Sequence, residues 1–374
     1  MQFPTLRNTF ISLIGVLLGL GLLMVYSASI TARPTEFEQV YLSRHLLFLG
    51  CAVIVGIVSA LVPPRFWRLA APWLYALTVL LLVAVLIPGI GHRVNGAQRW
   101  LRFGSISMQP SEIAKFTLPL LVCWWLSRCR PDSEGGRRRF RSWLIEFAVV
   151  VPIGLVLGLV VVEPDLGTAA FLGGAAAVAL LLARWPMRNF LISVVTFFPI
   201  VAMVLALRPY QWQRIQGFLA AWRDIDLAPY QVRQSLTTLG VGGLHGVGLG
   251  SGWQKLSFLP EANTDFVFAV LGEELGLIGT LGLILLWTAL FLVGLRMLST
   301  RPVRSFEFAV GATLLTQVVL QAALNVAVVT AMVPPKGISH PLISYGGSSL
   351  VASLAALGIV VSMSRRETDV SLEN

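Results

Sequence analysis

The sequence predicts an all-α integral membrane protein with about ten transmembrane helices and a large extracytoplasmic loop, near residues 208–264, between the seventh and eighth helices. The first observation behind this prediction is composition: 56% of the residues are hydrophobic and only 12% are charged, whereas soluble domains carry about 25% charged residues. The second is that apolar stretches long enough to cross a bilayer, roughly 17 to 25 residues, recur along the chain. We therefore expect residues 1–374 to form a single polytopic membrane domain.

The apolar stretches follow one another along the whole sequence. They lie at residues 9–26, 45–62, 73–88, 111–127, 143–162, 165–183, 189–207, 265–294, 305–331 and 346–364. The first resembles a signal peptide, but it is long enough to span and further spans follow, so we read it as an uncleaved helix. Only Glu163-Pro164-Asp165 separates the fifth stretch from the sixth. A sharp turn is expected there, because Pro164 disfavours helix at Glu163 and Asp165 can cap the next helix.

The basic residues predict the orientation in the membrane. An even number of spans puts both termini on one side, and the short loops on that side carry most of the arginines, including Arg128, Arg130, Arg137, Arg138, Arg139 and Arg141. The positive-inside rule then places both termini in the cytoplasm. Attraction to anionic lipid accounts for most of the net charge of +10, so nucleic acid is not an expected partner.

Three carboxylates stand in and just before the eighth span. They are Asp265, Glu273 and Glu274, within residues 260–276. Ionisable groups in membrane helices are costly and are functional candidates by default. At about 1.5 Å per residue the glutamates lie roughly 12 Å deeper than Asp265, so we expect Asp265 at the outer water boundary and the pair within the helix bundle.

Residues 95–115 are polar although they adjoin a span. Pro110 is expected to start a helix, and Glu112 and Lys115 then share one face at i and i+3, where they can neutralise each other. Two interpretations remain open. The pair is a structural ion pair, or Lys115 and Arg99 surround an anionic headgroup.

The predicted outer loop has an aromatic part and a glycine-rich part. Its aromatic residues, Tyr210, Trp212, Phe218 and Trp222, suit a helix lying in the membrane interface. Glycines then recur from Gly240 to Gly252. A dinucleotide-binding loop would need a strand before it and a helix after it in a soluble βαβ unit, so we favour a flexible or close-packed loop.

A second outer segment, residues 333–349, breaks helical structure before the last span. Irregular backbone near a membrane needs a cavity or protein partners. Lys336 and the turn from Ser344 to Ser349 are therefore candidates for lining a cavity. His340 alone is expected to be a hydrogen-bonded loop residue rather than a base.

Several segments carry a family resemblance. They are Val-Asn-Gly-Ala-Gln-Arg-Trp (94–100), Gln-Pro-Ser-Glu-Ile-Ala-Lys (109–115), Glu-Pro-Asp-Leu-Gly-Thr (163–168), Gly-Val-Gly-Leu-Gly (246–250), the run from Leu259 to Gly276, and Pro-Leu-Ile-Ser-Tyr-Gly-Gly-Ser-Ser (341–349). In this order, and over nearly the whole chain, they resemble the SEDS family of shape, elongation, division and sporulation proteins. The segments around Asp265 and Lys336 are more similar to the division-type members than to the elongation-type members.

This resemblance implies a peptidoglycan glycosyltransferase in the bacterial cytoplasmic (inner) membrane. It would polymerise lipid II into glycan strands on the outer face during septal cell-wall synthesis, with inversion at the anomeric carbon, and release undecaprenyl pyrophosphate. A class B penicillin-binding protein and other divisome proteins are the implied partners. No cofactor is required by the sequence, although a divalent cation, Mg or Mn, is kept open.

The resemblance also implies roles for individual residues. Asp265 matches the family's essential acidic residue and is the expected catalytic base. The candidates for binding the substrate are Lys115, Arg99, Glu112, Lys255, Lys336 and Glu261, with the four cations around the pyrophosphate. Glu261 either assists Asp265 or holds a cation through oxygen ligands; the sequence shows no dense acidic cluster for a dedicated metal site.

Three other functions are weighed against this one. An elongation-type polymerase is the nearest. A lipid II flippase would usually show internal repeats or interrupted helices in matching halves, and no convincing repeat is visible. A scaffold that only recruits the penicillin-binding protein would leave the buried Glu112 and Lys115 without a purpose.

Overall fold

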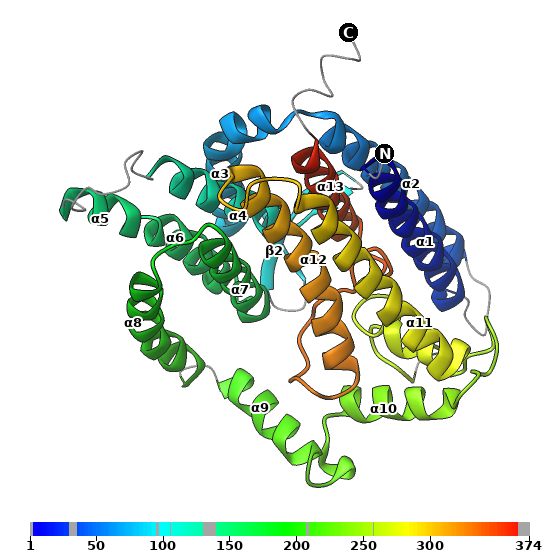
Figure 1. The fold of residues 1–374 in the computed structure, drawn as a ribbon. Coiled ribbons are helices and arrows are strands. Elements are labelled where there is room, and N and C mark those ends of the chain that lie inside the picture. Colours follow the sequence, from blue (N-terminus) through cyan, green and yellow to red (C-terminus); the bar gives the residue numbers. More distant parts are fainter. Residues whose placement is uncertain are drawn as a thin grey trace. The chain divides into compact units, whose positions relative to one another are not determined.

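The computed structural model describes residues 3–29, 36–94, 97–104, 106–129, 140–206, 209–256 and 258–365. Arg130 and Arg137–Arg139 of the predicted cytoplasmic loops lie outside these residues. The described chain is mostly helical, as predicted (Figure 1). Its internal contacts divide it into two compact units. Unit 1 comprises Met1–Gly50, Thr196–Val293 and Val318–Leu350, and unit 2 comprises Cys51–Val195, Gly294–Gln317 and Val351–Asn374.

Each predicted span overlaps a helix or a pair of helices. The helices are α1 (Phe3–Ser29), α2 (Glu36–Leu61), α3 (Pro64–Leu86), α4 (Pro110–Arg128), α5 (Phe140–Phe147), α6 (Val150–Val162), α7 (Leu166–Leu182), α8 (Met187–Ala206), α9 (Pro209–Ala221), α10 (Tyr230–Gly242), α11 (Val267–Leu298), α12 (Phe306–Val329) and α13 (Gly347–Ser364). A helix was predicted in the aromatic part of the outer loop, and α9 is present there; α10 and the short 3₁₀ helix Ile225–Leu227 were not anticipated.

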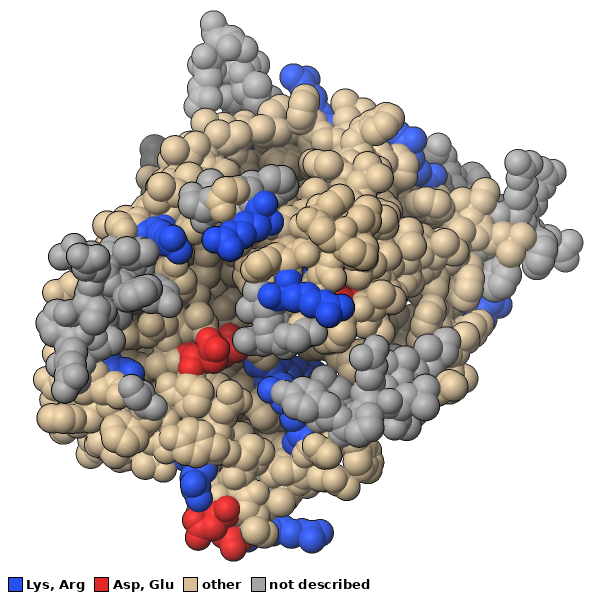
Figure 2. All heavy atoms as spheres, turned by 180° about the vertical axis from the view of Figure 1, so that it is seen from behind, with Lys and Arg blue, Asp and Glu red and all other residues tan. Residues whose placement is uncertain are grey.

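Seven segments among the described residues are long and apolar enough to cross a membrane. They correspond to α1, α2, α3, the α5–α6 region, α11, α12 and α13. The other three predicted spans form α7 and α8, whose apolar segments are shorter, and α4, which carries Glu112 and Lys115. On the face in Figure 2, uncharged residues form most of the described surface. Large apolar side chains such as Trp73, which is 78% exposed on α3, suit contact with lipid.

Unit 2 contains a small sheet that the all-α prediction missed. Strands β1 (Gly91–Val94), β2 (Ala97–Phe103) and β3 (Ile106–Met108) pair antiparallel in the order β1-β2-β3. The local sequence shows why: Leu101 is buried while its neighbour Arg102 is exposed, as expected for a strand with one covered face. Strand β2 lies against α3 and α4, which pack in turn with α6 and α7.

In unit 1 the helix α11 is interrupted at Gly276, so the single continuous span expected at residues 265–294 is wrong in this detail. Gly276 has φ 66° and ψ −163°, outside the helical region. In an unbroken helix the N–H groups of Leu277 and Ile278 would donate to the carbonyls of Glu273 and Glu274. Here they donate to Gly243 O and Leu244 O, at 3.0 and 3.2 Å.

The two carbonyls that lose their helical donors at this break accept hydrogen bonds from the glycine-rich segment. Val247 N donates to Glu273 O at 2.9 Å and Gly248 N donates to Glu274 O at 3.1 Å. A Cβ at Gly242 would lie 1.9 Å from Gly272 O, and one at Gly246 would lie 2.1 Å from Glu274 O. The segment is therefore a close-packed loop against α11, the second of the two structures that the sequence allowed.

This close approach predicts different outcomes at two neighbouring glycines of α10. Gly242→Ala should destabilise the protein by about 1–3 kcal/mol or more, because its Cβ overlaps the α11 backbone. Gly240→Ala is the matched control, since no atom lies within 4 Å of its Cβ, and it should be neutral or stabilise by up to ~1 kcal/mol. Thermal unfolding in detergent measures both; equal midpoints would contradict the close packing.

Candidate functional site

Asp265 lies in the turn that leads into α11, in unit 1. Its backbone carbonyl accepts a hydrogen bond from Asn325 Nδ2 of α12 at 2.7 Å. Its carboxylate is directed at another part of the chain, since a Cβ built on Gly337 would lie 3.2 Å from Asp265 Oδ2. Gly337 follows Lys336, so the half-buried carboxylate lies beside the loop that the sequence singled out for a cavity lining.

Residues 330–346 are fastened to this turn and to α12 by further hydrogen bonds. Tyr345 N donates to Asn263 O at 2.9 Å, and Ser344 Oγ donates to Thr264 O. From α12, Asn325 Nδ2 also donates to Ile338 O at 2.8 Å. The structure thereby brings Asp265, the exposed Glu261 of the same turn and the Lys336 loop into one region. Glu261 accepts a hydrogen bond from Thr264 Oγ1 at 2.9 Å.

Lys336 differs from the other three candidate cations. It is half-buried, and burial lowers the pKa of its ammonium group below the usual 10.5. Within the described part of the chain no ion pair or hydrogen bond of this ammonium is found, whereas Arg99, Lys115 and Lys255 each pair with a carboxylate. A partly desolvated cation without a carboxylate is suited to an anionic ligand.

His340 is buried within the same loop. Its Nδ1 donates to Pro341 O at 3.1 Å, and its ring stacks on Phe268 with 6.5 Å between centroids. Burial lowers the pKa of this imidazole to about 4, so the ring is neutral near pH 7. The prediction of a hydrogen-bonded loop residue agrees with these contacts.

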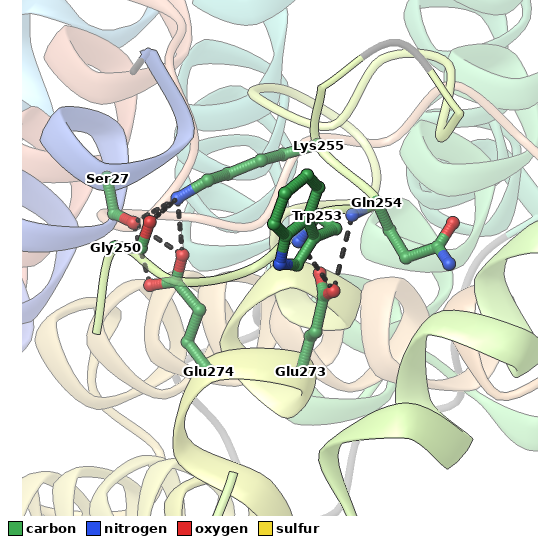
Figure 3. Close-up of polar contacts among 7 residues, drawn as sticks. All are labelled: Ser27, Gly250, Trp253, Gln254, Lys255, Glu273 and Glu274. Carbon is green, nitrogen blue, oxygen red and sulfur yellow. Dashed lines mark hydrogen bonds and ion pairs between the residues drawn. The ribbon is translucent and has the colours of Figure 1, made fainter. Parts of the chain in front are cut away.

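Lys255 lies inside unit 1, in a network with Ser27 of α1 and Glu274 of α11 (Figure 3). Its Nζ donates to Glu274 Oε1 at 2.6 Å, to Ser27 Oγ at 2.9 Å and to Gly250 O at 3.1 Å. Ser27 Oγ lies 2.6 and 2.7 Å from the two oxygens of Glu274. All three donors of the ammonium group have acceptors, an arrangement that serves the structure of the loop.

Glu273 holds the same loop through its backbone. Its Oε1 accepts from Trp253 N at 2.9 Å and from Gln254 N at 3.2 Å (Figure 3). Both glutamates are only 1% exposed, as expected for groups inside the protein. The sequence left Glu273 and Glu274 without roles, and the structure gives them one in attaching the glycine-rich segment to broken α11.

The remaining predicted site residues belong to unit 2. Lys115 Nζ lies 2.7 Å from Glu112 Oε1, which confirms the predicted ion pair, and 5.4 Å from the ring centroid of Phe171. As predicted, Pro110 begins α4, and the Asp165 side chain caps α7 by accepting from Thr168 N at 3.0 Å.

Arg99 of β2 encloses the turn between α6 and α7. Its Nε donates to Glu163 O at 3.2 Å and its Nη2 to Pro164 O at 2.6 Å, while Nη1 lies 3.4 Å from Asp165 Oδ2. The sequence analysis did not anticipate this contact, because β2 itself was missed. The guanidinium side chain remains 31% exposed, so it also reaches solvent.

Glu163 is a buried acid that the sequence analysis treated only as part of a turn. Neither of its carboxyl oxygens has a hydrogen-bond partner among the described residues. Burial, and secondarily the negative charge of Asp165, raises the pKa of Glu163 to about 8, against the opposing influence of Arg99. Its only signal in the sequence was a glutamate directly after a strongly apolar run.

These features define a multi-pass membrane protein with a carboxylate held beside a lysine-bearing loop. Residues 8–369 match the FtsW/RodA/SpoVE family model, described as cell cycle protein. The chain belongs to this family.

Named relatives match over almost the whole chain. The Coxiella burnetii protein named probable peptidoglycan glycosyltransferase FtsW is 38% identical, over 92% of each chain. Stage V sporulation protein E of Bacillus subtilis is 36% identical, over 97% of each chain.

Solved structures agree with the sequence comparison. A chain from a peptidoglycan synthase complex that coordinates polymerization and crosslinking has a TM-score of 0.74 at 26% identity, over 96% of this chain and 97% of that one. The rod shape determining protein RodA of Thermus thermophilus has a TM-score of 0.68 at 25% identity, over 96% of each chain. The fold is therefore that of the FtsW and RodA proteins.

The network around Lys255 makes a prediction about stability. Lys255→Met should lower the free energy of unfolding by about 3–5 kcal/mol, because it leaves the Glu274 carboxylate buried without its cation. The double variant Lys255→Met with Glu274→Leu should recover at least half of that loss, since no unpaired charge remains. Thermal unfolding of Lys255→Met, Glu274→Leu and the double variant provides the measurement, and a double variant as unstable as the sum of its single variants would refute the pairing.

The raised pKa of Glu163 should make the stability of the protein depend on pH. Because its pKa rises from 4.5 to about 8 on folding, the folded protein keeps a proton that the unfolded chain releases. This stabilisation is complete below about pH 4.5 and is lost as the pH rises through 8. Glu163→Gln should therefore melt close to wild type at pH 5 but higher at pH 9, by about 2–4 °C for each kcal/mol regained.

The control for this experiment is Glu261→Gln, which neutralises an exposed carboxylate of unit 1. Melting temperatures at both pH values are compared for the three proteins. A Glu163→Gln variant that gains no more than the control on going from pH 5 to pH 9 would show that Glu163 is ionised in the folded protein.

Proposed function

We propose that this protein is a peptidoglycan glycosyltransferase that polymerises lipid II into glycan strands for septal cell-wall synthesis during cell division. Relatives named for this activity are 35–38% identical over 92–96% of the chain. The observation that carries the proposal is the position of the Asp265 carboxylate against Gly337, next to Lys336, a half-buried lysine for which the described residues show no carboxylate partner. An acid–base group and a cation for a leaving group are what glycosyl transfer from a pyrophosphate requires.

In the proposed reaction Asp265 accepts the proton of the acceptor sugar's 4-hydroxyl. The hydroxyl oxygen attacks the anomeric carbon of the donor, whose bond to the pyrophosphate oxygen breaks, and undecaprenyl pyrophosphate leaves. The Lys336 ammonium stabilises the charge that develops on this leaving group. A single displacement inverts the anomeric carbon, so no carboxylate is needed as a nucleophile in addition to the base.

The other predicted substrate residues receive graded roles in this proposal. Lys115, held by Glu112, and the partly exposed Arg99 remain proposed ligands of the anionic headgroup. Lys255 is left out, because its three donors are already used inside unit 1. Lys336 is the first cation to test.

A divalent cation could bind at the Asp265 turn if the substrate supplied some of its ligands. Among the described residues no group of three or more His, Cys, Asp or Glu side chains could hold a metal. Magnesium commonly binds through one or two carboxylates together with substrate phosphates. Glu261 and Asp265 could thus hold Mg or Mn shared with the substrate pyrophosphate, where it would supply further positive charge.

We also propose the cellular setting that the sequence predicted. The protein lies in the bacterial cytoplasmic membrane with both termini in the cytoplasm and the Asp265 turn on the extracytoplasmic face. A class B penicillin-binding protein crosslinks the product, together with other divisome proteins. The similarity to a chain of a synthase complex that joins polymerization to crosslinking supports such a partner.

Transport of lipid II is the second candidate, and one observation favours it. Interrupted helices with polar groups at the break are typical of secondary transporters, and α11 is interrupted beside Glu273 and Glu274. However, the break is filled by the chain's own glycine-rich loop, so it offers no free backbone groups to a substrate.

The proposal predicts that Asp265→Asn, a nearly isosteric change, lowers polymerisation about 10²–10⁴-fold by removing the general base. Lys336→Gln should lower it ~10-fold or more by removing charge at the leaving group. Both variants should melt near the wild-type temperature. Polymerisation of labelled lipid II is measured with the purified chain and a class B penicillin-binding protein.

Two results would overturn the proposal. A folded Asp265→Asn variant that polymerises at the wild-type rate would remove Asp265 from the reaction. A wild-type protein that forms no glycan, yet moves lipid II across vesicles, would identify the transporter.

A further inference from the structure

The side-chain amide of Asn325 joins two separate segments of unit 1. Asn325 is fully buried in α12, and its Nδ2 donates one hydrogen to Asp265 O at 2.7 Å and the other to Ile338 O at 2.8 Å. An amide nitrogen carries two hydrogens, so both are used. Its Oδ1 has no partner among the described residues, which shows that the amide faces the two carbonyls with its donating side.

The same helix face makes a second contact with the loop. Gln321, one turn before Asn325, donates from Nε2 to Ser339 O at 2.9 Å. Residues at i and i+4 lie on one side of a helix. Together these amides fix the carbonyls of Ile338 and Ser339, two consecutive residues of the loop, to α12.

Asn325 reaches Asp265 as well. The carboxylate of Asp265 lies against Gly337, between Lys336 and Ile338. The hydrogen bond from Asn325 to Ile338 O therefore fixes the positions of Gly337 and Lys336. Its hydrogen bond to Asp265 O fixes the backbone from which the Asp265 side chain extends. A change in this amide alters the position of the proposed base relative to the proposed cation.

We propose that Asn325 is a positioning residue for the transfer reaction, holding the Asp265 carboxylate and the Lys336 ammonium at a fixed separation without touching the substrate. This inference rests on the proposed roles of Asp265 and Lys336. General base catalysis requires its groups within hydrogen-bond reach, and a misplacement of about 1 Å costs ~10²-fold in rate. The effect of Asn325 is expected on turnover rather than on substrate binding.

The test compares three variants of α12. Asn325→Leu keeps the branching and the number of side-chain heavy atoms and removes both donors, and Asn325→Asp keeps the shape but places an oxygen against two carbonyls. Thr313→Val is the control, because Thr313 is fully buried in the same helix and, among the described residues, bonds only to Ala309 O. For Asn325→Leu we expect turnover at saturating lipid II to fall ~100-fold, while the lipid II concentration for half-maximal rate changes by less than about 3-fold.

Relative to wild type at the same pH, Asn325→Asp should recover part of its turnover as the pH is lowered, because a protonated carboxyl can donate one of the two bonds. Thr313→Val should keep turnover within about 3-fold of wild type. Equal losses for Asn325→Leu and Thr313→Val would overturn the inference, as would a variant whose half-saturating lipid II concentration rises while turnover stays constant.

A second measurement is independent of activity. Competitive amine labelling of Lys336, followed by mass spectrometry across a pH range, reports its pKa. Asn325→Leu should raise the labelling midpoint toward the usual lysine value by releasing the loop to solvent, and Thr313→Val should leave it unchanged. An unchanged midpoint in Asn325→Leu refutes the positioning role, whereas a shifted midpoint in a protein that makes no glycan refutes only the proposed function.

Discussion

The exchange of backbone hydrogen bonds at the break in α11 is the constraint on which the rest of unit 1 depends. A chain that interrupts a helix within an apolar environment must find other partners for its N–H and C=O groups, because each unsatisfied group costs several kcal/mol. The glycine-rich segment supplies these partners in both directions: Gly243 and Leu244 accept from α11, and Val247 and Gly248 donate to it. The approach is close enough to require glycine at positions 242 and 246.

The carboxylates of Glu273 and Glu274 follow from the same arrangement. Buried carboxylates are tolerated when hydrogen bonds or cations stabilise them. Here two backbone N–H groups of the loop donate to one oxygen of Glu273, and Ser27 of α1 together with Lys255 stabilises Glu274. The short helical segment before Gly276 is thereby attached at its end to the loop. At its start, Asn325 and the Lys336 loop hold the Asp265 turn. The proposed base thus stands on a segment fixed at both ends.

How much the sequence could predict depended on the distance over which each interaction acts. The start of α4 at Pro110, the cap at Asp165 and the pair of Glu112 with Lys115 are local, and the structure has each of them. Seven of the predicted spans overlap described segments that are long and apolar enough to cross a membrane. The sheet at residues 91–108 was missed because its strands are short and its alternation covers few residues. Contacts between distant segments, such as Ser27 with Glu274 or Arg99 with the turn at Glu163, have no local pattern that would reveal them.

Whether a lysine already forms an ion pair with a carboxylate also decides how well it suits a pyrophosphate. The sequence alone could not show which lysines form such pairs. An ammonium already bound to a carboxylate presents little net charge, and it must weaken that bond before it can bind another anion. Lys115 and Lys255 are in this position, with carboxylate oxygens at 2.7 and 2.6 Å. Lys336 is partly buried, which lowers its pKa, and it has no such bond to any residue that the structure describes. An arriving phosphate would offset the cost of this burial and favour the charged form, so this lysine gains most from the substrate and can follow the charge as it develops on the leaving group.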